Sequence, residues 1–283
     1  MNPRPRPMLC QAAEPFNSPS HSFEIKWDGV RVLAGVESGR LRMWGRSEAT
    51  DWAERYPELD ALRRLPSGTV VDGETVLLRD GLPSLSALLS RHALSNPRKI
   101  LHAARRRTAT YMLFDVLYHR GESVMDRPLI ERRRLLEELV ERLGDGESQD
   151  DEARFRFSEG TRNHGKARFK SVVEQGHEGL VAKHLAGRYH PGRRHAAWRK
   201  IKPVRELAAV VIGYRGGDRL RSLLAAAPDE QGRLTYVAEL SHGFSRSISE
   251  KLLPLLAAHR RRQPLVPCEK QAAWVDPVIR CRV

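Results

Sequence analysis

The stretch Ser22-Phe23-Glu24-Ile25-Lys26-Trp27-Asp28-Gly29-Val30-Arg31 places a lysine between an apolar run and an Asp-Gly pair. An Asp-Gly pair between two β-prone runs predicts a hairpin turn, so we expect Lys26 at the end of a strand. Ser38-Gly39 predicts a second turn between the strands that follow. Its neighbours Ile25 and Trp27 would partly desolvate the ammonium group, and a desolvated lysine is a candidate nucleophile. The same pattern is equally typical of an exposed strand lysine beside a turn.

Composition narrows the class of protein. The 283 residues are enough for two domains, and 49 Lys and Arg against 35 Asp and Glu leave a net charge of +14. Because arginine binds phosphate oxygens bidentately and no basic surface-seeking helix is found, we expect nucleic acid as partner and no membrane. The 3 cysteines are widely separated and form no C-x-x-C pair, which argues against a zinc site and a disulfide framework.

Turn residues and apolar periodicity predict an α+β chain in three segments. Residues 1–21, rich in Pro and Ser, are expected to form an extended N-terminal lead-in. Residues 22–203 alternate β-rich runs with helical spacing, and residues 204–283 show the short strands and single helix typical of a small β-barrel. Within the middle segment we predict a helix over 51–65, irregular structure over 93–107 and a loop over 144–152.

Charged residues recur beside the predicted strands of the middle segment. Asp72-Gly73-Glu74 interrupts a second β-rich run, either as another hairpin turn or as acids beside a basic or metal-bearing site. Lys200 and Lys202 are two residues apart and point to one face of a strand, where like charges repel unless an anion lies between them. Cations for phosphates, carboxylates for a metal and a nucleophilic lysine together predict phosphoryl or nucleotidyl transfer.

Five motifs occur in a fixed order along the chain: Lys26-Trp27-Asp28-Gly29-Val30-Arg31, Asp72-Gly73-Glu74, Phe114-Asp115, Glu178-Gly179-Leu180-Val181-Ala182-Lys183 and Lys200-Ile201-Lys202. With them, residues 8–283 resemble the ATP-dependent DNA ligases of the covalent nucleotidyltransferase superfamily. The chain is most similar to the ligase domain of bacterial non-homologous end-joining ligases.

The resemblance implies roles for the matching residues around the nucleotide. Lys26 would attack the α-phosphate of ATP and carry AMP as a phosphoramidate. Glu24 and the main chain of Ile25 would contact the adenine edge. Phe114 would stack on the base, although an aromatic residue in a strand is more often a core residue.

The resemblance also implies which residues hold ribose, phosphates and a divalent metal, Mg2+ or Mn2+. Arg31 and Arg46 would hold ribose and phosphates, and Glu74 would bind the ribose or the metal. Glu178 would help to hold the metal. The cations that would neutralise phosphate charge are Lys183, Lys200 and Lys202.

The implied fold is a nucleotidyltransferase (adenylation) domain of antiparallel sheets with flanking helices, followed by an OB-fold domain. The implied partners are nicked or broken double-stranded DNA and end-joining repair proteins, for a monomer in the bacterial cytoplasm or nucleoid. The family's final R-x-D-K motif is not found before Val283, so we expect an incomplete OB-fold and slow charging of Lys26. An RNA ligase or capping-type nucleotidyltransferase, and a non-catalytic DNA-end-binding module, stay open as alternatives.

Overall fold

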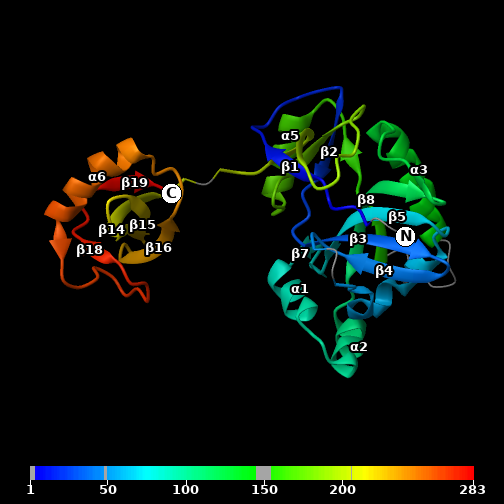
Figure 1. Cartoon of the computed structure of the whole chain (residues 1–283), viewed down its shortest axis with the longest axis horizontal. Helices are drawn as coiled ribbons and strands as arrows, with labels where there is room; N and C mark the ends of the chain where they lie inside the picture. The colour runs from blue at the N-terminus through cyan, green and yellow to red at the C-terminus, as the bar shows by residue number, and fades with distance from the viewer. Residues whose placement is uncertain (1–3, 48–49, 145–153, 205) are drawn as a thin grey trace. The chain divides into compact units, whose positions relative to one another are not determined.

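The computed structural model describes residues 4–47, 50–144, 154–204 and 206–283. The chain divides into two compact units, Met1–Pro203 and Val204–Val283 (Figure 1). The sequence places the domain boundary after the same proline. Most of the loop predicted over 144–152 lies outside the described residues.

A five-stranded sheet in the first unit contains the strand that precedes Lys26. Its strand order is β1-β13-β12-β2-β11. The bounds are β1 (Leu9–Ala12), β2 (His21–Ile25), β11 (Gly160–Thr161), β12 (Leu180–His184) and β13 (Arg194–Ile201). The lead-in predicted for residues 1–21 is therefore wrong for its described part, because β1 pairs with β13 and Met8 is fully buried. The stretch that contains β1 forms the edge of this sheet because it pairs with residues far along the chain.

A six-stranded sheet forms the other layer of this unit, in the order β10-β8-β5-β3-β4 with β9 beside β8. The bounds are β3 (Val30–Glu37), β4 (Arg40–Trp44), β5 (Thr69–Val76), β8 (Thr110–His119), β9 (Glu122–Ser123) and β10 (Phe155–Phe157). Because β10 runs parallel to β8 and β1 parallel to β13, both sheets are mixed, which corrects the expected antiparallel sheets. Asp72-Gly73-Glu74 lies within β5 and does not interrupt it.

The chain crosses from one sheet to the other directly after Lys26. Strands β2 and β3 belong to different sheets, so the hairpin turn predicted at Asp28-Gly29 is wrong. Glycine is needed there for a different reason, because a Cβ on Gly29 would lie 2.2 Å from the carbonyl oxygen of Thr75. The turn predicted at Ser38-Gly39 is confirmed, with φ of 49° and 73° in the hairpin that joins β3 to β4.

Helices cover the outer faces of these sheets. Two 3-10 helices, η1 (Ala53–Arg55) and η2 (Pro57–Arg64), replace the helix predicted over 51–65. The remaining elements of this unit are β6 (Leu78–Arg79), β7 (Leu82–Pro83), α1 (Leu85–His92), α2 (Pro97–Arg106), α3 (Leu129–Gly144) and α5 (Gly165–Glu174). Helix α2 forms where irregular structure was predicted, because Asn96 caps it and proline suits its first position.

The two layers are held together by an apolar cluster between the sheets. Strand β3 is buried on both faces: Val32, Ala34 and Val36 pack toward the helices, whereas Leu33 points toward the other sheet. Residues of both sheets meet in that second cluster, which contains Leu33, Trp44, Val70, Phe114, Leu117 and Trp198. Burial on both faces explains why β3 shows a continuous apolar run instead of an alternating pattern.

The second unit is an antiparallel sheet with one helix. Its elements are β14 (Ala208–Gly216), β15 (Leu220–Pro228), β16 (Leu234–Leu240), α6 (Arg246–Ala258), β17 (Arg260–Arg261), β18 (Ala273–Val275) and β19 (Arg280–Arg282). The strands run in the order β16-β15-β14-β18-β17, with β19 beside β14. The incomplete OB-fold stays a prediction. In the part of the chain that the structure describes, no helix is long and apolar enough to cross a membrane.

A buried ion pair between β8 and α3 generates a stability prediction. Arg132 and Asp115 are both fully buried and joined by two hydrogen bonds of 2.8 Å. Asp115→Ala leaves an unpaired buried charge and is expected to lower the free energy of unfolding by about 3 to 5 kcal/mol. Urea denaturation followed by tryptophan fluorescence measures this, because 4 of the 5 tryptophans lie in the first unit. The double variant Asp115→Leu/Arg132→Met should recover most of the loss, and a double variant as unstable as the single one would contradict the explanation.

Candidate active site

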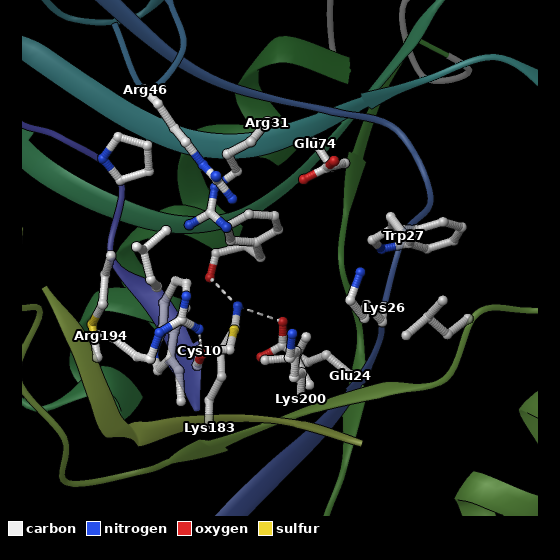
Figure 2. Close-up of a pocket in the computed structure, with 17 residues that line it drawn as sticks. Cys10, Glu24, Lys26, Trp27, Arg31, Arg46, Glu74, Lys183, Arg194 and Lys200 are labelled. Carbon is white, nitrogen blue, oxygen red and sulfur yellow. Dashed lines mark hydrogen bonds and ion pairs between the residues drawn. The ribbon is translucent and has the colours of Figure 1, made fainter. Parts of the chain in front are cut away.

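A pocket in the first unit collects residues from both sheets and from the N-terminal segment. Figure 2 shows Lys26, Trp27 and Glu74 on one side of it, and Cys10 and Arg194 on the opposite side. Most of the residues singled out in the sequence line this pocket, namely Glu24, Ile25, Lys26, Arg31, Arg46, Glu74, Phe114, Lys183 and Lys200. Glu178 and Lys202 lie outside the lining, but Glu178 pairs with Lys26, and Lys202 pairs with Glu178.

Lys26 is held at the point where the chain leaves β2. Its backbone N–H donates to the carbonyl oxygen of Gly179 at 2.9 Å, and its ammonium pairs with the carboxylate of Glu178. Glu178 also pairs with Lys202 at 2.7 Å. Burial alone would raise the pKa of Glu178, but hydrogen bonds from Lys202 and Lys26 outweigh it and lower that pKa. An ionised carboxylate therefore lies beside the candidate nucleophile.

Gly179 lets β12 approach β13 closely enough to place Glu178. Its φ is +138°, and an added Cβ would lie 2.1 Å from the carbonyl oxygen of Ile201. Only glycine fits this conformation and this approach without strain.

A buried ion pair forms the floor of the pocket. Nζ of Lys183 lies 2.7 Å from Glu24 and donates to the carbonyl oxygen of Phe114 at 3.3 Å. Figure 2 marks the contact between Lys183 and Glu24 with a dashed line. The other carboxylate oxygen of Glu24 accepts from Arg133 at 2.6 Å. Burial lowers the pKa of Lys183, and Glu24 acts against that shift. Because its charge is already compensated, the phosphate-neutralising role of Lys183 stays a prediction.

Arg31 is fixed by a second buried acid. Its guanidinium makes two hydrogen bonds to Asp72, at 2.6 and 2.7 Å, and lies 4.4 Å from the ring centroid of Phe114. Asp72 also accepts from the hydroxyl of Tyr189 at 2.7 Å, and that hydroxyl accepts from the backbone N–H of Met8 at 2.8 Å. One carboxylate thus joins β3, β5, the loop before β13 and the N-terminal segment.

Phe114 is both a core residue and a pocket residue. Its side chain is buried against Trp198, with ring centroids 5.9 Å apart in an edge-to-face arrangement. It also lines the pocket. The core interpretation of this aromatic residue is confirmed, and stacking on a base stays a prediction.

Glu74 and Glu178 are the acids available to a divalent metal. Within the described residues, no group of three or more His, Cys, Asp or Glu side chains is placed to hold an ion. Mg2+ commonly binds one or two carboxylates and completes its shell with waters and substrate phosphates, so two acids at this pocket suit it. Burial raises the pKa of Glu74 to about 7, although Arg31 and Lys26 act to lower it.

Several lining residues were missed from the sequence. Met8, Cys10 and Arg194 enter the pocket because β1 lies against β13, and no local pattern marks that pairing. Asp72 was noticed as an acid but not as the partner of Arg31. Its place two residues before Glu74 in the same strand is a signal that could have drawn attention to it.

Comparison with known proteins decides the family. The model of the ATP dependent DNA ligase domain family matches residues 7–202. The chain belongs to the ATP-dependent DNA ligase family. The match spans β1 to β13 and therefore contains every residue of the pocket.

Relatives and a solved structure agree with this family. The multifunctional non-homologous end joining protein LigD of Pseudomonas aeruginosa is 31% identical over 98% of this chain and 33% of its own length. The DNA ligase of Thermococcus fumicolans is 32% identical over 85% of this chain and 45% of its own length. A mycobacterial DNA ligase D complexed with ATP and MES has a TM-score of 0.58 at 27% identity, covering 98% of this chain and 88% of that one. The chain thus spans a third to under a half of these two curated relatives.

The raised pKa of Glu74 makes stability depend on pH. Glutamate has an ordinary pKa of 4.5, and the folded value is about 7, so the neutral form is favoured in the fold. That preference stabilises the protein fully below the ordinary pKa and is lost as the pH rises through about 7. Glu74→Gln imitates the neutral form at every pH. Its free energy of unfolding relative to wild type should therefore rise by about 2 to 3 kcal/mol when the pH is raised from about 4 to about 8. Urea denaturation at both pH values measures it, and a constant difference would contradict the expected titration.

Proposed function

We propose that this chain is an ATP-dependent DNA ligase that seals nicks or joins DNA ends through a covalent lysyl-AMP intermediate. The observation that carries the proposal is the position of Lys26, which lines the pocket beside Glu178 together with the cations Arg31, Arg46 and Lys200. Membership of the family supports the same reaction.

The reaction has three steps. The Nζ atom of Lys26 attacks the α-phosphorus of ATP, loses a proton, and releases pyrophosphate. The 5′-phosphate of the nicked strand then displaces the lysine and takes the AMP. Finally the 3′-hydroxyl attacks the activated 5′-phosphate, forms the phosphodiester and releases AMP. The first displacement needs its attacking and leaving atoms in line, which a nucleophile fixed by its backbone and its side chain favours.

The pocket residues divide between base and phosphates. We assign Glu24, the main chain of Ile25 and Phe114 to adenine, because they line the inner part where both carboxylate oxygens of Glu24 are already oriented. We assign Arg31 to the ribose and the phosphate beside it. Arg46 and Lys200 line the pocket without an ion pair among the described residues, so their charge is available to phosphates.

The acids supply the metal site of this proposal. Glu74 and Glu178 would hold Mg2+ or Mn2+, which neutralises phosphate charge when bound. Glu178 at present compensates Lys26 and Lys202. Lys202 is the more exposed of these two cations. We assign it to the phosphates, which it would contact after leaving Glu178.

The second unit and the partners complete the proposal. We assign Val204–Val283 to an OB-fold that binds duplex DNA, since small antiparallel sheets of this kind bind nucleic acids. The name of the Pseudomonas aeruginosa relative supports a role in end joining, with repair proteins as partners. We assign a monomeric enzyme to the bacterial cytoplasm or nucleoid, where its DNA substrate is found.

Lys26→Arg tests the nucleophile with little disturbance of the fold. Arginine keeps a cation beside Glu178, yet its guanidinium does not attack phosphorus. Incubation with α-labelled ATP and Mg2+ should label wild type, leave Lys26→Arg and Lys26→Ala unlabelled, and still label Lys170→Ala, which changes an exposed lysine of α5 outside the pocket. Intact mass with and without ATP gives the same answer without a label.

Two outcomes would contradict the proposal. Labelling of Lys26→Arg would show that another residue carries AMP, and unlabelled wild type that still binds DNA would favour a non-catalytic end-binding module. The labelled wild type is then given nicked duplex DNA or nicked RNA, and sealing of RNA alone would select an RNA ligase.

A further inference from the structure

Helix α2 carries a surface with no acid near it in sequence. No Asp or Glu occurs from residue 81 to 114, whereas six Lys and Arg do. Five of these cations are exposed on α2 or at its end, namely Arg98, Lys99, Arg105, Arg106 and Arg107. We call these five side chains the α2 basic surface. Figure 1 shows α1 and α2 together at the lower edge of the first unit.

The surface is hollowed where its cations converge. Arg98, Lys99, Arg106 and Arg107 line a shallow cavity with His102. Within the described residues, none of these four cations makes an ion pair. Their positive charges therefore repel one another without internal compensation.

Glu58, an acid near the end of α2, already has hydrogen-bond and ion-pair partners. Glu58 pairs with Arg91, a buried residue of α1, and its other contact is the backbone N–H of Ala109 at 2.9 Å. Arg91 in turn donates to the carbonyl oxygen of Arg107 at 2.7 Å, which anchors the end of α2. The internal ion pair positions the segment and leaves the outward cations exposed.

Helix stability does not account for the position of these charges. Arg105 and Arg106 lie in the last turn, where cations suit the helix dipole. Arg98 and Lys99 lie in the first turn, where cations are unfavourable and where this helix has no acid. Charges at both ends are thus better explained by an external anion that contacts the length of the helix.

The scaffold beneath these cations is firm. Asn96 accepts hydrogen bonds from the backbone N–H groups of Arg98 and Lys99, at 3.0 and 3.2 Å. Ile100, Ala103 and Ala104 are buried on the opposite face, and α2 contacts η2. A rigid row of cations is suited to a rigid polyanion.

We propose that the α2 basic surface binds the phosphate backbone of duplex DNA, outside the pocket that holds Lys26. The proposal rests on the proposed function, which makes DNA the substrate of this unit. The exposed face of α2 has one large apolar side chain, Leu101, and no Trp or Phe, so it lacks the apolar stripe of a helix that inserts into a membrane. Arginines bind DNA phosphates whatever the base sequence, so the contact should increase the affinity for duplex DNA without adding base specificity.

A matched pair of double variants tests the surface. Arg98→Gln/Arg106→Gln removes two cations eight residues apart on α2. Arg134→Gln/Arg142→Gln removes two cations at the same spacing on α3, where Glu131, Glu137, Glu138 and Glu141 mix the charge. Circular dichroism and the thermal unfolding midpoint first establish that both variants are folded. Binding of a labelled nicked duplex is then measured by fluorescence anisotropy, without ATP, between about 50 and 200 mM salt.

The slope of log Kd against log salt concentration is the decisive readout. Each lost phosphate contact lowers its magnitude by about 0.9, so the α2 variant should lose about 1.8 and the α3 variant much less. Equal slopes in the two variants would overturn the proposal, as would an unchanged slope in the α2 variant with weakened binding to phosphatidylglycerol vesicles. Loss of slope together with a wild type that forms no lysyl-AMP would refute the proposed function and leave the α2 surface supported.

Discussion

The ion pair between Glu24 and Lys183 is the contact on which the rest of the pocket depends. Both side chains are almost fully buried, and they lie on adjacent strands of the five-stranded sheet. Lys183 also bonds to a carbonyl of β8 in the other sheet, and Arg133 of α3 contacts Glu24. Removing either partner would leave a buried charge unpaired, which is unfavourable. The pair therefore holds β2, β12, β8 and α3 in their relative positions.

Charge pairing also distinguishes the pocket cations that the protein itself neutralises from those that it leaves uncompensated. Asp72 compensates Arg31, and Glu178 compensates Lys26. Arg46 and Lys200 remain at the pocket without such a partner among the described residues. A triphosphate brought to this site would meet cations whose charge the protein itself has not neutralised, and a buried base would meet groups already fixed by hydrogen bonds.

Local sequence patterns predicted many elements and failed where long-range pairing decides. The Ser38-Gly39 hairpin was predicted because its turn chemistry is contained in two residues. Asp28-Gly29 looked the same, yet the chain there crosses between sheets, because β2 and β3 pair with strands far along the chain. Residues 9–12 became a strand for the same reason, since their partner lies more than 180 residues away.

The sequence by itself determined the residue types of the site and their order along the chain. Lys26, Glu74, Phe114 and Lys200 were singled out from motifs, and the structure places all four at one pocket. The tertiary structure alone decided their partners, such as the contact of Tyr189 with Asp72 across 117 positions. A motif specifies chemistry over a few residues, whereas a buried charge is compensated by whichever side chain the fold brings within hydrogen-bond distance.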